Sequence, residues 1–170
     1  SSTSFVNGSS LPLWASCWVD GTRSSGAGRS PAIKWKKIPR GTDNLVLLVH
    51  NSSTDMVHWL VMVSKKHRYF KTGFPVGLPS TSGAVVKGFF QSANDYGVTG
   101  YSGPCPGVGE MHRLTFEAYA IRGNQKLPFP ESASAIRKII KRRVIGKALF
   151  KGWFAGPGEG DVATPTPTPT

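Results

Sequence analysis

The stretch from Asn94 to Tyr119 constrains this chain more than any other, because it joins two halves of unlike character. The first half is rich in glycine, proline and small polar residues, a composition that forms neither a helix nor a regular strand. The second half begins at His112 and alternates apolar with polar residues, as a strand with one buried face does. We therefore predict an ordered loop that holds an imidazole and backbone N–H groups around a small ligand. The alternative is a plain glycine-rich connection between two strands.

The length and composition indicate one β-rich domain. A chain of 170 residues can bury a proper core. Its 20 glycines and 13 prolines, set between short β-branched and aromatic runs, favour strands over a helical bundle. We predict a polar N-terminal segment over residues 1–12, a single domain over residues 13–155 and an extended Gly/Thr/Pro-rich tail over residues 156–170. No stretch of the sequence is apolar for long enough to cross a bilayer as a helix.

The expected elements follow from apolar runs and turn residues. The predicted strands cover residues 13–20, 32–35, 45–50, 58–63, 84–90, 112–120 and 147–154. Ser132 to Val144 is the predicted helix, because Ile136, Ile139 and Ile140 recur at helical spacing.

The charge of the chain is strongly positive. Lysine and arginine number 21 and aspartate and glutamate 9, which gives a formal net charge of +12. Such a field attracts nucleic acid, anionic membrane surfaces, phosphorylated ligands or acidic proteins, without choosing among them. The predicted helix carries basic residues opposite its apolar stripe, namely Arg137, Lys138, Lys141 and Arg142. We interpret this face either as a solvated helix surface or as a docking surface for nucleic acid, an anionic membrane or an acidic protein.

The cysteines and the acceptor tripeptides bear on the compartment. Cys17 and Cys105 form neither a disulfide framework nor a metal-binding spacing, so we expect two free buried thiols; pairing in an oxidising compartment is the alternative. Asn7-Gly8-Ser9 and Asn51-Ser52-Ser53 fit the glycosylation pattern, and the Thr/Pro tail suits O-linked sugars. The first residue is Ser, which we interpret as a processed N-terminus. These features favour a secretory, extracellular or organellar location over a cytoplasmic one.

Sequence motifs of enzymes are missing, since there is no GxSxG, HExxH or CxxC pattern. Two weaker hypotheses are a thiol–imidazole nucleophile made by Cys105 with His112, and a zinc ion held by three of the four histidines. The histidines, at positions 50, 58, 67 and 112, do not have metal-ligand spacing. We predict a protein that is not an enzyme and that needs no metal or cofactor.

Several motifs, in the same order along the chain, resemble those of the phosphatidylethanolamine-binding protein family, especially its shorter bacterial members. The strongest similarity lies in the central loop: Asp95-Tyr96-Gly97, Gly100-Tyr101, Gly103-Pro104, Pro106 and Gly109-Glu110-Met111-His112-Arg113. Weaker similarities lie at Ser30-Pro31, at His58-Trp59 and in the helix with its following strand. The resemblance covers about residues 20 to 155.

The resemblance implies a mainly β fold, with two packed antiparallel sheets, a helix near the C-terminus and a strand after it. It also implies a non-enzymatic binding or regulatory protein, whose pocket takes a small anion such as a phosphoryl group or a lipid headgroup. Carried over by position, the pocket residues are Asn51, His58, Gly103, Pro104 and His112. The alternative is a structural subunit of a larger assembly, with an idle pocket and a basic surface that packs on nucleic acid or acidic neighbours.

The chain departs from the family pattern after the first core strand. Asn51-Ser52-Ser53 stands where the family has Asp-Pro-Asp. An asparagine can orient an imidazole but cannot favour its charge, and the loss of a carboxylate also removes repulsion of an anion. Arg113 loses its family partner at position 53, and Asp55 is the candidate replacement.

Overall fold

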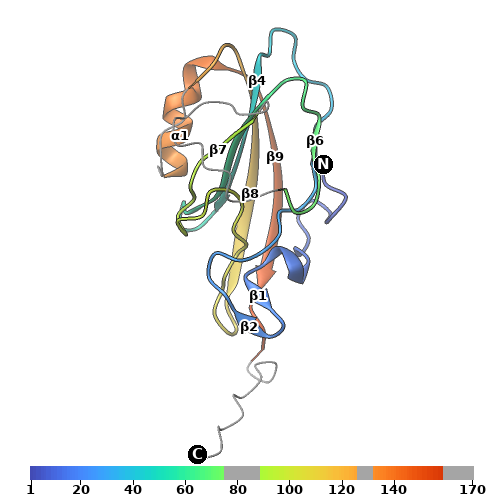
Figure 1. Cartoon of the computed structure of the whole chain (residues 1–170), viewed down its shortest axis with the longest axis vertical. Helices are drawn as coiled ribbons and strands as arrows, with labels where there is room; N and C mark the ends of the chain where they lie inside the picture. The colour runs from blue at the N-terminus through green and yellow to red at the C-terminus, as the bar shows by residue number, and fades with distance from the viewer. Residues whose placement is uncertain (75–88, 126–131, 159–170) are drawn as a thin grey trace, which may run out of the picture.

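The computed structural model describes residues 1–74, 89–125 and 132–158, and it is organised around one long antiparallel sheet (Figure 1). The strand order is β7-β5-β4-β8-β9. The strands are β4 (Asn44–Asn51), β5 (Val57–Ser64), β7 (Phe89–Gln91), β8 (Met111–Ile121) and β9 (Val144–Ala155). β4 lies in the middle, and every residue in it is buried, as the predicted central strand requires.

Short elements complete the domain. Two two-stranded sheets pair β1 (Trp18–Val19) with β2 (Thr22–Arg23), and β3 (Ile33–Lys34) with β6 (Tyr69–Phe70). The helical elements are η1 (Leu13–Ala15), α1 (Ala133–Ile140) and η2 (Lys141–Arg143), and β9 follows η2 directly. The predicted mainly β fold with a helix and a strand near the C-terminus is confirmed. No helix within the described ranges is long and apolar enough to cross a membrane.

The large sheet has a core on each of its faces. Leu47, Trp59 and Phe116 belong to the core on the side of β1, β3 and β6. Leu48 and Leu60 belong to the core under α1. Figure 1 shows α1 on one side of the sheet and β6 on the opposite side. The alternation predicted for β8 is confirmed, because Leu114 and Phe116 enter the first core while Tyr119 and Ile121 enter the second.

The N-terminal region differs from its predicted form. Residues 13–20 do not make one strand: Leu13–Ala15 form a turn of 3-10 helix in which the Ser16 N–H donates to the Leu13 carbonyl, and only Trp18–Val19 are extended. Tertiary contacts decide this conformation, because the Tyr101 hydroxyl donates to the Ala15 carbonyl at 2.7 Å. The boundary predicted at residue 13 stays a prediction, although Phe5 and Leu11, which precede it, are buried in the core.

The helix is shorter than its apolar spacing predicts. It ends at Ile140, and Val144 instead begins β9, where it pairs with Ile121 of β8. Sheet pairing therefore prevails over the helical period at Val144. The Ser132 hydroxyl accepts from the Ala135 N–H and so caps the start of the helix. Most of the strand predicted over residues 84–90 lies outside the described residues.

Cys17 and Cys105 form a disulfide, so the expectation of two free thiols is wrong. The bond joins the segment around η1 to the central loop across 88 residues of sequence. Two hydrogen bonds beside it do the same: the Cys17 N–H donates to the Pro104 carbonyl at 3.1 Å, and Trp18 Nε1 donates to the Pro106 carbonyl at 3.1 Å. Sequence spacing could not show this pairing, because the fold alone brings the two segments together.

Replacing both cysteines by serine is expected to destabilise the domain strongly. Closing a loop of this length restricts the unfolded chain by about 4 kcal/mol in the chain-entropy account. The free energy of unfolding, measured by urea denaturation of the double variant and of the oxidised protein, tests this value. A loss below about 1 kcal/mol would contradict a structural role for the bond.

Candidate functional site

His58 occupies a bulge in β5. Val49 of β4 pairs with Trp59, but the next residue of β4, His50, pairs with Val57, so His58 is left without a partner in the ladder. Bulges re-aim a side chain and are common beside functional sites. His58 is fully buried at this position.

One nitrogen of the His58 ring makes a hydrogen bond to the backbone, and the other has no hydrogen-bond partner among the described residues. Nδ1 lies 2.9 Å from the Ser102 carbonyl oxygen, and because a carbonyl only accepts, Nδ1 carries the proton. Nε2 is buried and has no hydrogen-bond partner among the described residues. Burial lowers the pKa of His58 from 6.5 to about 4, and the nearby charges of His112 and His50 act in the same direction. At neutral pH His58 is therefore a neutral imidazole with a lone pair on Nε2.

Asn94 fastens the central loop to this bulge. Its side chain is buried and all its hydrogen-bonding groups are used. The amide nitrogen donates to His58 O at 3.2 Å, Gly100 O at 3.0 Å and Ser102 Oγ at 2.9 Å. The amide oxygen accepts from the N–H groups of Tyr96 at 2.9 Å and Val98 at 3.1 Å. The hydrogen bonds of Asn94 therefore order the loop. The composition of the loop predicts that it is ordered, but it does not show which side chain orders it.

Gly103 and Pro104 connect the loop to the N-terminal segments. A Cβ on Gly103 would lie 2.4 Å from the Ala15 carbonyl oxygen, so no other residue fits there without a shift of backbone. The Gly103 N–H donates to the Ala27 carbonyl at 2.8 Å. The N–H groups of Gly107 and Gly109 are also engaged, with the Glu110 carboxylate and the Pro157 carbonyl. These three amides are therefore not available as the anion donors that the sequence suggested.

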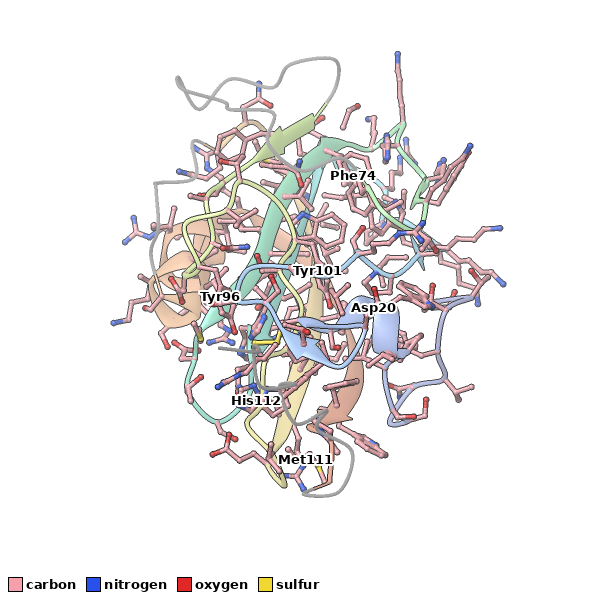
Figure 2. The ribbon with its side chains drawn as sticks, turned by 60° about the horizontal axis from the view of Figure 1, so that its bottom comes forward. Asp20, Phe74, Tyr96, Tyr101, Met111 and His112 are labelled. Atoms are coloured by element: carbon pink, nitrogen blue, oxygen red, sulfur yellow. A yellow bond between two sulfur atoms is a disulfide. The ribbon has the colours of Figure 1, made fainter. Side chains whose placement is uncertain are left out.

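His112 stands at the start of β8, on the face that carries Leu114 and Phe116. Its Nδ1 is buried and, within the described part of the chain, has no hydrogen-bond partner. Burial lowers the pKa of His112, the Glu110 carboxylate raises it, and the Arg23 guanidinium lowers it. Figure 2 brings this end of the molecule forward and shows His112, Tyr96 and Tyr101 on it.

Arg23 and Tyr96 lie close to these two histidines. Arg23 Nη2 donates to the Cys105 carbonyl at 2.6 Å, and its charge acts on both Tyr96 and His112. The Tyr96 ring lies 5.4 Å, centre to centre, from the His58 ring. Sequence reasoning missed Arg23, because no motif contains it and its contact with Cys105 spans 82 residues. The resemblance did include Tyr96, without giving it a role.

Asn51 shapes the turn that follows β4. It is buried, its side-chain oxygen accepts from the Ser53 N–H at 2.9 Å, and its backbone pairs with Leu114. A buried side chain is not presented to a glycosylating enzyme by the folded domain, whereas Asn7 is exposed. Asn51 thus lies on the same face of the sheet as Leu114, two residues along β8 from His112.

Arg137 points from α1 into the sheet rather than into solvent. Its Nε donates to Glu117 at 2.9 Å, its Nη1 to Asp55 at 3.3 Å and its Nη2 to His50 Nε2 at 2.8 Å. Tyr119 also donates to Glu117, and Lys147 lies 3.4 Å from it. Burial acts to raise the pKa of Glu117, but hydrogen bonds from Arg137 and Tyr119 hold it below the ordinary value. Arg137 therefore ties α1 to the sheet, while Lys138, Lys141 and Arg142 are exposed.

Asp55 binds the helix and not Arg113. Burial acts to raise its pKa, but hydrogen bonds from Ser134 and Arg137 lower it. Both the N–H and the hydroxyl of Ser134 donate to Asp55, at 2.9 and 2.5 Å. The suggested Asp55–Arg113 pair is replaced by this contact, and Arg113 is exposed.

The zinc and thiol hypotheses find no support in the geometry. Within residues 1–74, 89–125 and 132–158, no group of three histidine, cysteine, aspartate or glutamate residues could hold a metal ion. Cys105 is oxidised, so it offers no thiolate beside His112.

Comparisons with known proteins agree with the fold and the loop. The family model described as "Phosphatidylethanolamine-binding protein" matches residues 1–155. A UPF0098 protein of Aquifex aeolicus is 32% identical over 160 residues, which cover 91% of this chain and 84% of the relative. The crystal structure of Escherichia coli YbcL, described as a member of the mammalian PEBP family, superposes with a TM-score of 0.74 at 20% identity, covering 92% of this chain and 96% of the other. A PEBP homologue from Chlamydia trachomatis gives 0.69 at 24% identity, covering 92% and 95%.

The depressed pKa of His58 makes stability depend on pH in a defined direction. The unfolded chain binds a proton near pH 6.5 and the folded chain only near 4, so the free energy of unfolding should fall as pH drops through that window. Two and a half pH units correspond to a loss on the order of 3 kcal/mol. Urea denaturation from pH 7 to 4.5 should show this slope, and His58→Gln should flatten it. An equal slope in both proteins would contradict the assignment.

Proposed function

The chain belongs to the phosphatidylethanolamine-binding protein family, and we propose that it is a binding protein whose pocket, between His58, His112 and Arg23, takes a small anionic group. Membership of this family supports a binding role. The anionic ligand is our inference from the pocket itself, and a phosphoryl group is the class that fits it best.

The observation that carries the proposal is a pair of buried imidazole nitrogens with no partner. Buried polar atoms in folded proteins are nearly always hydrogen-bonded, and exceptions call for a ligand or another explanation. Of the three such atoms among the described residues, His58 Nε2, His67 Nε2 and His112 Nδ1, the first and the last occur on residues whose charges influence one another. The permanent charge of Arg23 acts on the same place. An anion that still carries a proton, such as a singly protonated phosphoryl group, would satisfy both rings and gain a charge-assisted contact.

The protonation state of His58 selects the form of the ligand. Because its proton is on Nδ1, the neutral ring offers Nε2 as an acceptor. A singly protonated phosphoryl group can donate its P–OH to Nε2 and direct its charged oxygens toward Arg23 and His112. A dianion would instead require His58 to gain a second proton. In both cases the complex holds one proton more than the free protein and the free dianion together, so the affinity for the phosphoryl group should rise as pH falls.

A carboxylate that would repel an anion is absent from the position where the family carries one, since Asn51 stands there and is neutral. Glu110 is near enough to raise the pKa of His112, but its carboxylate already accepts the Gly107 N–H at 2.7 Å. The neutral residue at position 51 therefore removes one source of repulsion for an anion.

We also propose an oxidising location for this domain, in line with the secretory or organellar placement suggested by the sequence. The Cys17–Cys105 bond supports it, because disulfides persist in such compartments and are rare in a reducing cytosol.

Phosphate and phosphoethanolamine, titrated by calorimetry, are expected to bind the wild type and to bind Arg23→Gln about tenfold or more weakly. The loss corresponds to one hydrogen bond to a charged group. Arg113→Gln is the matched control, because it removes the same charge from an exposed residue adjacent to His112. Binding of phosphate without a preference for phosphoethanolamine would indicate that the ligand is a free anion. A preference for phosphoethanolamine would indicate that it is a lipid headgroup.

Equal affinity of the two variants for phosphate would contradict the pocket. So would stabilisation by heparin alone, to the same extent in the wild type and in His112→Ala and less at high salt, because that result assigns binding to the general basic surface.

The pH dependence of phosphate affinity is a separate test. The second pKa of a phosphomonoester lies near 6, so affinity should rise from pH 7.5 to 5.5 in the wild type. A flat or inverted profile would contradict the role of neutral His58 as an acceptor.

A further inference from the structure

β9 is the edge strand of the large sheet, and its two halves differ in what covers them. Residues 7–11 lie along the second half: the Gly8 N–H donates to the Lys151 carbonyl at 2.8 Å, and the Leu11 N–H donates to the Trp153 carbonyl at 2.7 Å. Ser10 and Trp153 form a parallel bridge. The edge of β9 therefore already pairs its outward backbone groups with another segment of this chain.

In the first half of β9, the same backbone groups have no partner among the described residues. Backbone groups alternate in direction along a strand, so those of Lys147 and Leu149 point the same way as those of Lys151 and Trp153. The register with β8 is regular here, with Lys147 opposite Tyr119 and Leu149 opposite Glu117. Neither Lys147 nor Leu149 makes a backbone hydrogen bond outside the sheet within the described ranges. Two N–H and two C=O groups thus remain as an open template.

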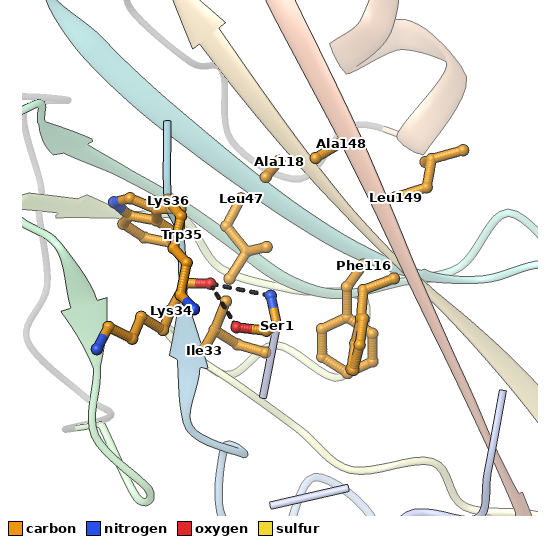
Figure 3. A pocket seen from close by; sticks show the side chains of 11 residues that line it. Ser1, Ile33, Lys34, Trp35, Lys36, Leu47, Phe116, Ala118, Ala148 and Leu149 are labelled. Carbon is orange, nitrogen blue, oxygen red and sulfur yellow. Dashed lines mark hydrogen bonds between the residues drawn. The ribbon is translucent and has the colours of Figure 1, made fainter. Parts of the chain in front are cut away.

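An apolar cavity of about 280 Å³ adjoins this open edge (Figure 3). Ala148, Leu149 and Phe150 of β9 line it, together with Leu47 and Phe116 from the sheet. Its opposite wall is the segment of β3 and the residues after it, Ile33 to Lys36. A strand added to β9 would direct alternate side chains toward this cavity, which is how pockets beside a sheet edge select a peptide.

The charges around the edge favour an acidic segment of another protein over a second copy of this chain as the added strand. Lys34 and Lys36 line the cavity with exposed side chains, and Lys151 lies on β9 itself, whereas Lys147 is already paired with Glu117. A second copy of this chain would place the same lysines opposite one another and would bring together two molecules of charge +12. An acidic segment meets the opposite field.

We propose that the edge of β9 over residues 147–149 is a docking site for an extended acidic segment of a partner protein, which adds as a strand and places apolar side chains in the adjoining cavity. The backbone groups require a peptide rather than a small molecule. The lysines require acidic residues, and the cavity requires that apolar residues alternate with them. This site is distinct from the anion pocket, because His112 lies near the opposite end of β8, where it pairs with Phe154.

A fluorescein-labelled peptide in which glutamate alternates with valine is the probe, and the same peptide with lysine in place of glutamate is its control. Fluorescence anisotropy with the full chain should show binding of the acidic probe only. Hydrogen exchange should then show new protection at the amides of Lys147 and Leu149. Such protection would not arise from a diffuse electrostatic association.

Two pairs of variants separate the backbone contribution from the charge. Leu149→Pro removes the outward N–H and leaves the pairing with β8 intact, whereas Leu149→Ala keeps the N–H; the first should bind the probe about tenfold more weakly than the second. Lys36→Glu should weaken binding several-fold, and Lys141→Glu, an equal charge change on the exposed end of the helical region, should not.

Equal binding by Leu149→Pro and Leu149→Ala would overturn the proposal, because no backbone ladder would then form. Dimerisation of the wild type in sedimentation experiments, abolished by Leu149→Pro, would also overturn it by assigning the edge to a second copy. Melting curves of both variants establish that they remain folded, so that a loss of binding reports on the edge.

Discussion

The hydrogen bonds of the buried Asn94 side chain, whose two amide N–H groups are shared among three acceptors, are the interaction on which the rest of the site depends. They hold the carbonyl of His58, the backbone around Gly100 and the hydroxyl of Ser102 in one arrangement. Ser102 then orients the His58 ring, and Gly103 and Pro104 pack on the N-terminal segments. A loop rich in glycine has much conformational freedom to lose, so this ordering requires a fully satisfied polar group at its centre.

The fold could largely be predicted from the sequence, because the patterns that identify its strands lie within single short segments. Continuous apolar runs identified β4 and β5, alternation of apolar with polar residues identified β8, and the order of motifs indicated the family. The bulge at His58, the disulfide and the role of Arg23 could not be predicted, since each depends on segments that the fold brings together. Arg137 shows the same limit: its place on a basic helix face suggested solvent, but Glu117 and His50 on the face of the sheet under α1, and Asp55 in the turn after β4, accept its hydrogen bonds.

The two faces of the sheet use their charged groups differently. Under α1, acidic and basic side chains neutralise one another in a compact network, so they contribute to the attachment of the helix. On the other face, His58 and His112 have unpaired nitrogens, and Arg23 is bound only to a carbonyl among the contacts described. Our two binding proposals accordingly concern this face and the β9 edge, where lysines adjoin backbone groups that have no partner among the described residues.

The protonation of His58 is the most direct test of this account, and nitrogen–proton correlation NMR of labelled protein measures it. The account predicts a neutral ring with its proton on Nδ1 from pH 7.5 down to about 5, and a change at Nε2 when phosphate is added. A proton on Nε2 in the free protein, or an ordinary titration near pH 6.5, would contradict it. Either result would mean that the bulge does not hold an acceptor toward the pocket.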